Sequence, residues 1–161
     1  MDTANKMRIT DIETFVVRMP SVSPYMGELE EHVTANSSGH FRRSRGHPTF
    51  YSLATEGFLV KITTDDGTTG WGEAQAPIVP DVLDVLVQRL FKPFAIGRDP
   101  LDIDGFWAMV YDGMKVRGHV CSFTIDAMAA CDIALWDIAG KVNGQPVYKV
   151  MGGDLREKVP V

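Results

Sequence analysis

The sequence predicts an α+β fold, in which a three-stranded antiparallel sheet is followed by a bundle of helices. Apolar residues alternate with polar ones over residues 8–19 and 58–74, which is the period of a half-buried strand. From residue 80 onward the apolar period lengthens to that of a helix. A chain of 161 residues that is 45% hydrophobic can bury the core of one domain.

The sheet is expected to be a meander, with strands at residues 8–19, 58–64 and 68–74. In the first strand, one face carries Ile12, Thr14 and Val16. Asp66 and Gly67 join the second strand to the third. An Asp-Gly pair favours a tight hairpin, because glycine adopts the positive φ that such a turn needs.

Two amphipathic helices are expected after the sheet. The first has an apolar stripe made of Val82, Leu83, Leu86, Val87, Leu90 and Phe91. Pro80 lies in its first turn, and Pro93 is expected to stop it. The second is expected to begin at Asp99–Pro100, with Asp102 completing a capping box. Its core-facing stripe is Ile103, Phe106, Trp107 and Val110.

The third helix, Phe123–Val142, is small or apolar at nearly every position, and Asn143–Gly144 signals its end. A helix that is apolar around most of its circumference must be covered on more than one side. The meander and the other helices cover one flank, so a neighbouring domain or subunit is expected on another. The apolar ending Lys158–Val161 predicts that the chain stops in the first strand of something larger.

The segment Pro20–Thr49 is too long for an ordinary connection, and segments of this length are usually functional or disordered. Within it, Gly39–Pro48 gathers three arginines and two histidines, although the chain has a formal charge of -5. This cluster could be a nucleic-acid patch, a site for small anions or a solvated loop. The acidic net charge argues against nucleic acid, because that binding depends on neutralising phosphates.

The cellular context is indicated by features of the whole chain. Cys121 and Cys131 lie in an apolar, helix-like stretch and are expected to be buried thiols. The first residues contain no apolar leader, and no apolar run approaches the roughly 20 residues of a membrane span. We therefore expect a cytoplasmic protein without membrane contact.

Four motifs are spaced along the chain. They are residues 65–74 (DDGTTGWGEA), 97–100 (GRDP), 127–141 (AMAACDIALWDIAGK) and 145–153 (QPVYKVMGG). In this order they resemble the enolase superfamily, and more narrowly its mandelate racemase/muconate lactonizing enzyme group. The resemblance extends from about Arg8 to Val161.

The resemblance implies an α+β capping domain that packs on a (β/α)-barrel not contained in this chain. Residues 1–155 would be the capping domain, with a lid loop at 20–49, and residues 156–161 would begin the first barrel strand. In this family the barrel holds Mg²⁺, which binds the substrate carboxylate, and a Lys or His that removes the neighbouring proton. We therefore assign no catalytic residue and no metal ligand to this chain.

In the family the lid closes over the mouth of the barrel and helps to select the substrate. Arginines in the lid would suit a carboxylate substrate, because arginine binds carboxylates in a bidentate way. They could instead serve subunit contacts or solvation. The lid candidates for substrate contact are Tyr25, His40, Arg42, Arg43, Arg45 and His47. By the resemblance, Gln75 in the loop after the third strand is the first candidate for touching substrate.

Several acidic residues invite a metal-binding interpretation, but a structural one is favoured. Asp126, Asp132 and Asp137 are six and five residues apart on the third helix, so they point to different faces. Asp137 is expected to pair with Lys141 at i+4, and Asp132 to bind a backbone N–H or an arginine. Glu73, at a strand end, is expected to be a structural partner.

Within the family, the chain most resembles acid-sugar dehydratases. The residues that carry this resemblance are GRDP at 97–100, Tyr111-Asp112-Gly113 and Arg117-Gly118. The implied function is the capping and specificity domain of a Mg²⁺-dependent enzyme that removes the α-proton of an aldonate or aldarate. A racemase or epimerase is the alternative, followed by a cycloisomerase. The partners implied are a small carboxylate substrate and further copies in a homo-oligomer. A stand-alone, non-catalytic domain that oligomerises through Ala127–Ala139 is the alternative from another class.

Overall fold

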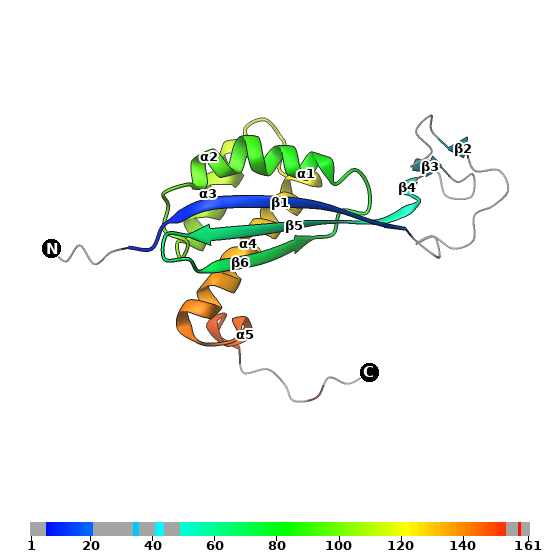
Figure 1. The fold of residues 1–161 in the computed structure, drawn as a ribbon. Coiled ribbons are helices and arrows are strands. Elements are labelled where there is room, and N and C mark those ends of the chain that lie inside the picture. Colours follow the sequence, from blue (N-terminus) through cyan, green and yellow to red (C-terminus); the bar gives the residue numbers. More distant parts are fainter. Residues whose placement is uncertain (1–5, 21–33, 36–40, 44–48, 154–157, 159–161) are drawn as a thin grey trace.

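The computed structural model describes residues 6–20, 34–35, 41–43, 49–153 and 158. Its central feature is an antiparallel sheet of three strands, β1 (Ile9–Pro20), β5 (Ala54–Thr64) and β6 (Thr69–Ala74), in the order β1-β5-β6. Helices pack on one face of this sheet and leave the other face open (Figure 1). The α+β fold with a three-stranded antiparallel meander is thus confirmed.

One face of the sheet presents a set of buried apolar residues to the helices. Phe58, Val60 and Ile62 alternate along β5 and are fully buried, and Ile12 of β1 lies opposite Ile62. The turn between β5 and β6 has the predicted chemistry, since Gly67 has a φ of +86°. Asp66 stabilises the turn, because its Oδ1 accepts hydrogen bonds from Thr64 Oγ1 and from the backbone N–H of Thr68.

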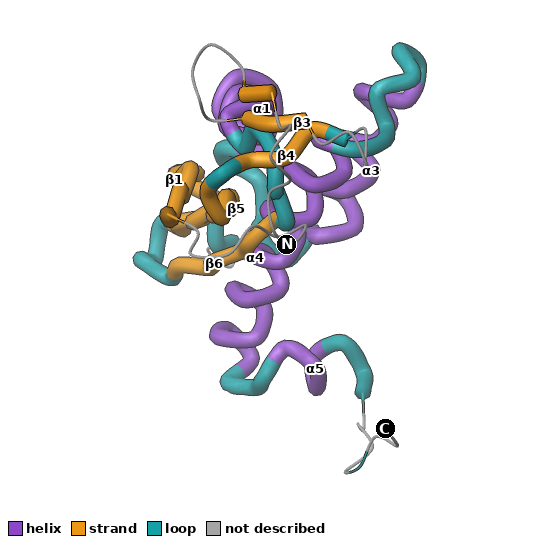
Figure 2. The backbone as a smooth tube through the Cα atoms, turned by 90° about the vertical axis from the view of Figure 1, so that its right-hand side faces the viewer, coloured by secondary structure: helices purple, strands orange, loops and turns teal. Residues whose placement is uncertain are grey.

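The long helix α4 (Phe123–Asn143) packs directly on β5 and β6 (Figure 2). Two glycines in β6, Gly70 and Gly72, allow this close contact, because the backbone carbonyls of Ala134 and Ala130 occupy the space that a Cβ would need. The helix ends as predicted, with Gly144 in the left-handed conformation. A further short helix, α5 (Val147–Val150), follows it.

The expectation that Pro93 stops the first helix is wrong. Helix α1 (Asp81–Leu86) continues through a π-helical turn, η1 (Val87–Phe91), into α2 (Lys92–Ala95). Pro93 lies in the first turn of α2, directly after the wider π turn. A change of hydrogen-bond register at this point accommodates a residue that has no backbone N–H.

The second helix begins later than predicted. Helix α3 spans Ile103–Lys115, and Asp102 rather than Asp99 occupies its N-cap position. Asp99 instead accepts a hydrogen bond from the N–H of Leu101 at 2.9 Å, which closes a separate turn around Pro100. Three residues of the expected core stripe, Ile103, Phe106 and Val110, are buried, and the fourth, Trp107, is half-buried and packs against the core.

Two other expectations need correction. The structure places a second sheet in and beside the segment predicted to be irregular, with β2 (Thr34–Ala35), β3 (Phe41–Arg43) and β4 (Phe50–Ser52) in sequence order. These strands are two or three residues long, too short to show an alternating pattern.

Cys131 is buried as expected, and burial raises the pKa of its thiol to about 12. Cys121, in the connection before α4, is exposed.

Candidate functional site

The candidate site lies at one end of the main sheet. Strand β1 ends, β5 begins and β6 ends at this side, and the small β2-β3-β4 sheet lies beyond it (Figure 1). Gln75 directly follows β6, and Arg43 lies in β3, where its backbone pairs with Thr34 and Phe50. The fold therefore brings Gln75 and the strand that carries Arg43 to the same end of the molecule, although they are far apart in sequence.

The other lid candidates cannot all be placed. Tyr25, His40, Arg45 and His47 lie outside the described residues. Arg42 and Arg43 are described as members of β3, in which Arg42 is opposite both Ala35 and Tyr51. Their contact with a substrate stays a prediction.

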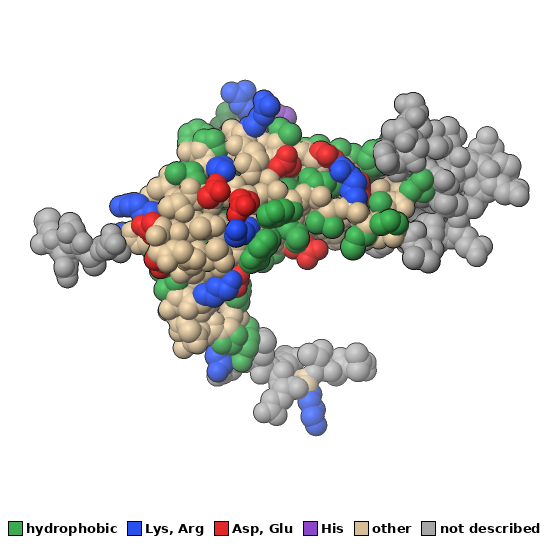
Figure 3. Space-filling model, viewed as in Figure 1, with side chains coloured by type: hydrophobic (Ala, Val, Ile, Leu, Met, Phe, Trp, Pro, Cys, Tyr) green, Lys and Arg blue, Asp and Glu red, His purple; other side chains and the backbone are tan. Residues whose placement is uncertain are grey.

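Gln75 continues the exposed side of β6. Trp71, Glu73 and Gln75 alternate toward the open face, and all three are exposed. The Trp71 ring stacks on Phe15 of β1 with 5.5 Å between ring centroids, and hydrophobic side chains gather over this face (Figure 3). Glu73 makes no hydrogen bond or ion pair with the other described residues, so the expectation that it is a structural partner is not met there.

An ion-pair network at the same end escaped the sequence analysis. Arg18 Nε donates to Glu56 Oε1 at 2.8 Å, and the Arg18 guanidinium also pairs with Asp81 at the start of α1. The Glu56 side chain is only 2% exposed, and its Oε2 has no partner among the described residues. The carboxylates, Glu56 first, raise the pKa of Arg18. The network holds β1, β5 and α1 together beside the candidate site.

The pairing register of β1 and β5 carries the signal for this network. Arg18 and Glu56 occupy opposite positions in the β1–β5 pairing, so their side chains lie on the same face of the sheet. The pattern of residues 58–64 placed the second strand too late in the chain to include Glu56. The missing signal was therefore the true start of β5 at Ala54.

The acidic residues of α4 have different roles. Asp137 Oδ2 accepts from Lys141 Nζ at 2.7 Å, which confirms the predicted i+4 pair, and also from the backbone N–H of Trp71 at 2.9 Å. It thereby satisfies a donor on the edge strand β6. Asp132 does not have the expected backbone or arginine partner among the described residues, and Asp126 has none either. Burial raises the pKa of Asp126.

One flank of α4 is incompletely covered by the described residues. This flank carries, at helical spacing, the half-buried residues Ile125, Ala129, Asp132 and Trp136 and the exposed Ile133. Ile133 is the most open of the large apolar side chains here, at 48% exposed. Ala134, which the sequence placed in the oligomerising face, is fully buried against β6 instead. The uncovered flank is therefore tested by a substitution at Ile133 and not at Ala134.

Asp132, on this flank of α4, should make the free energy of unfolding depend on pH. Burial, and secondarily the neighbouring Asp104 carboxylate, raise the pKa of Asp132. Between the unfolded and the folded pKa the native protein binds more protons than the unfolded chain, so the free energy of unfolding falls as the pH rises through this window. The penalty is complete once the pH lies above the folded pKa.

Replacing Asp132 by asparagine should remove this penalty. We expect Asp132→Asn to raise the free energy of unfolding at pH 7 by roughly 0.5 kcal/mol, a value discounted for partial exposure. The gain should shrink toward pH 4. Urea unfolding at both pH values measures it, with Glu73→Gln as an exposed control outside the helix. A loss of stability at pH 7 would contradict the prediction.

The described residues do not fit a magnesium site. No group of three or more His, Cys, Asp or Glu side chains among them could hold a metal ion. Among the described residues, no helix is both long and apolar enough to cross a bilayer.

The fold and its motifs match a known family. The family model described as the N-terminal domain of mandelate racemase / muconate lactonizing enzyme matches residues 44–152. The chain belongs to this family. The enolase-superfamily resemblance is thus confirmed, and the meander with its helices is the N-terminal domain of the mandelate racemase/muconate lactonizing enzyme group.

Two curated relatives carry names for sugar-acid chemistry. One is D-galactarolactone cycloisomerase of Agrobacterium fabrum, 38% identical over 101 residues, which are 63% of this chain and 26% of that protein. The other is D-galactonate dehydratase of Ralstonia pickettii, 38% identical over 111 residues, which are 69% of this chain and 28% of that protein. The match thus spans about a quarter of the length of these relatives.

Solved structures show the same fold. A member of the enolase superfamily from Agrobacterium tumefaciens superposes with a TM-score of 0.86 at 37% identity, over 93% of this chain and 38% of that one. A mandelate racemase/muconate lactonizing protein from Paracoccus denitrificans, complexed with magnesium, gives a TM-score of 0.64 at 28% identity. That match covers 96% of this chain and 32% of the Paracoccus chain.

Proposed function

We propose that this chain is the capping and substrate-specificity domain of a Mg²⁺-dependent acid-sugar dehydratase. Residues 1–155 form the domain, residues 20–49 its lid, and residues 156–161 begin the first strand of a catalytic barrel. The observation that carries the proposal is the convergence of Gln75 and the β3 strand at one end of the sheet. A single surface there can meet a substrate with residues from two distant segments.

The relatives support the substrate class. One is named for galactonate and one for galactarolactone, and both names refer to sugar acids. Such substrates carry a carboxylate and several hydroxyls. Arg43 and Arg45 can pair with a second anionic group or with hydroxyls, and Gln75 can donate and accept hydrogen bonds. Tyr25, His40 and His47 complete the proposed lid contacts.

The proposed reaction would transfer the α-proton of the sugar acid to a base, after which the β-hydroxyl would take up a proton and leave as water. The resulting enol tautomerises to a 2-oxo-3-deoxy acid, so atoms and charges balance. Magnesium would stabilise the enediolate charge, and a barrel residue would take the proton. This chain would orient the substrate and exclude water. On these grounds the 161-residue segment alone should be inactive.

Racemisation, or cycloisomerisation of a lactone, is the second candidate for the same site, and the cycloisomerase relative favours it. A stand-alone oligomerising domain is the alternative from another class, and the uncovered α4 flank favours a covering partner. The intact mass of the natural protein separates these classes. A mass near 17.8 kDa would contradict the enzyme proposal, and one enlarged by a barrel of roughly 250 residues would support it.

The activity test uses the natural protein that contains this chain, with Mg²⁺ and D-galactonate. Dehydration should produce a 2-oxo acid that semicarbazide traps, and EDTA should abolish it. Racemisation would instead exchange the α-proton with D₂O without releasing a 2-oxo acid. Gln75→Ala removes the amide and should raise KM several-fold. Gln145→Ala is the control, because Gln145 is exposed and remote from the site. Equal effects of the two substitutions would remove Gln75 from the site.

A further inference from the structure

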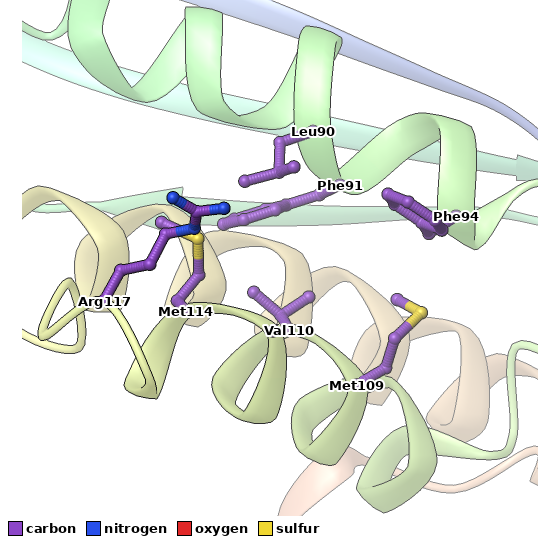
Figure 4. Close-up of a pocket in the computed structure, with 8 residues that line it drawn as sticks. Leu90, Phe91, Phe94, Met109, Val110, Met114 and Arg117 are labelled. Atoms are coloured by element: carbon purple, nitrogen blue, oxygen red, sulfur yellow. The ribbon is translucent and has the colours of Figure 1, made fainter.

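A cavity of about 500 Å³ lies between the η1–α2 segment and helix α3 (Figure 4). Its lining consists of Leu90, Phe91, Phe94, Met109, Val110, Gly113, Met114 and Arg117. Seven of these eight residues are aliphatic, aromatic, methionine or glycine, and none of the seven has a polar side chain. Its volume is within the range of small-molecule sites in proteins.

The walls of this cavity are apolar and adaptable. Phe91 and Val110 are buried at its base, at 1% and 5% exposed, whereas Phe94 at its margin is 63% exposed. Met109 and Met114 face the two aromatic rings from α3 (Figure 4). Methionine side chains are flexible and polarisable, so such walls can adjust to ligands of different shape.

One positive charge is placed at this apolar cavity. The guanidinium of Arg117 extends from the turn after α3 toward Leu90 and Phe91 (Figure 4). Its side chain makes no hydrogen bond or ion pair with other residues in the described part of the chain. Lys115, two residues earlier, differs because its Nζ pairs with Asp112 at 2.6 Å. Arg117 thus remains available to an anion at the cavity.

We propose that this cavity binds an amphipathic monocarboxylate, such as a medium-chain fatty acid. The hydrocarbon chain lies between the phenylalanines and the methionines, and the carboxylate pairs with Arg117. An acid sugar does not fit here, because the apolar walls leave its hydroxyls without hydrogen-bond partners. None of the lining residues belongs to the proposed lid, and the proposal does not depend on the proposed function.

The probe is octanoate, observed through the methyl groups of ¹³C-labelled methionines by NMR. We expect saturable shifts of the Met109 and Met114 methyls, with a Kd of roughly 1 mM for a ligand of this size. The methyls of Met7, Met19 and Met151, which do not line the cavity, should stay unchanged. Neutral 1-octanol serves as the matched ligand without a charge.

A cavity-filling variant tests the position of the site. Gly113 lies in α3 at the cavity, and a Cβ built on it meets no atom within 4 Å. Gly113→Leu should therefore fill the space without a clash and favour the helix, so a folding defect is not expected. It should abolish the octanoate shifts. Unchanged octanoate affinity in this folded variant would overturn the proposal.

A charge variant tests the anion contact. Arg117→Gln should weaken octanoate about fivefold, the effect of an exposed ion pair, and leave octanol binding unchanged. Lys115→Gln removes a cation of the same region and should change neither ligand. Equal losses for octanoate and octanol in Arg117→Gln would overturn the role of Arg117. If the Met109 and Met114 methyl shifts instead change with protein concentration when no ligand is present, a second copy of the chain covers the cavity. That result would overturn the proposal.

Discussion

Replacing Gly72 by alanine should lower the free energy of unfolding by at least about 3 kcal/mol, at the upper end of what overpacking costs. A Cβ on Gly72 would overlap the carbonyl oxygen of Ala130 and come within 2.8 Å of the backbone nitrogen of Ala134. Both contacts are with helix backbone, which cannot rotate away as a side chain can. Strand β6 would have to move away from α4, and the core between them would open.

Urea unfolding of the two proteins measures this loss. Gly57→Ala is the matched control, because Gly57 lies in the neighbouring strand β5 and an added Cβ meets only Glu73 Oε1 at 3.9 Å. This control should be neutral within about 0.5 kcal/mol. A Gly72→Ala protein as stable as Gly57→Ala would show that α4 does not pack on β6 as closely as described.

The second large effect is expected at Ala134. Its side chain is fully buried between α4 and β6, beside the backbone of Gly70. Ala134→Asp would bury a carboxylate that has no cationic partner, so we expect a loss of more than about 4 kcal/mol. This is a large part of the stability of an ordinary domain, and circular dichroism should show a mostly unfolded or aggregated protein.

Ile133→Asp is the control for this prediction, on the adjacent residue of the same helix. Ile133 is 48% exposed, so the variant should fold and lose only about 1–1.5 kcal/mol. If a barrel or a second copy covers this flank, Ile133→Asp should weaken that association, which analytical ultracentrifugation or interdomain crosslinking would detect. Similar stabilities for the two variants would contradict the burial assigned to Ala134.

Local chemistry allowed the sequence to predict most of the fold. The Asp66–Gly67 turn, the alternation in β5 and the Gly144 cap were all confirmed, because each depends on neighbours within a few residues. The Asp137–Lys141 pair was found for the same reason, since residues four apart share a helix face. The family was identified from motifs of this local kind.

The failures have physical causes as well. Pro93 was expected to stop a helix, but a π-helical turn before it shifts the backbone register. Asp99 has the sequence of a helix cap, yet it closes a turn, and the helix begins at Ile103. The β2-β3-β4 sheet depends on pairing between distant residues and has no periodic signal.

The candidate site was predictable only in outline. The sequence indicated Gln75 and the arginine-rich segment, but their position at the same end of the sheet follows from the strand order. The Arg18–Glu56 pair and the cavity beside Arg117 were not predicted, because each joins elements far apart in the chain.

The sequence by itself determined the α+β class, the hairpin, the helical stripes and the family, since these depend on residue type and short spacing. Only the tertiary structure decided which small residues carry the packing. Ala134 and Ile133 are adjacent and both apolar, yet one lies against β6 and the other on an open flank. Adjacent residues of a helix point about 100° apart, and the close contact of Gly70 and Gly72 with Ala134 and Ala130 shows which face of α4 meets the sheet.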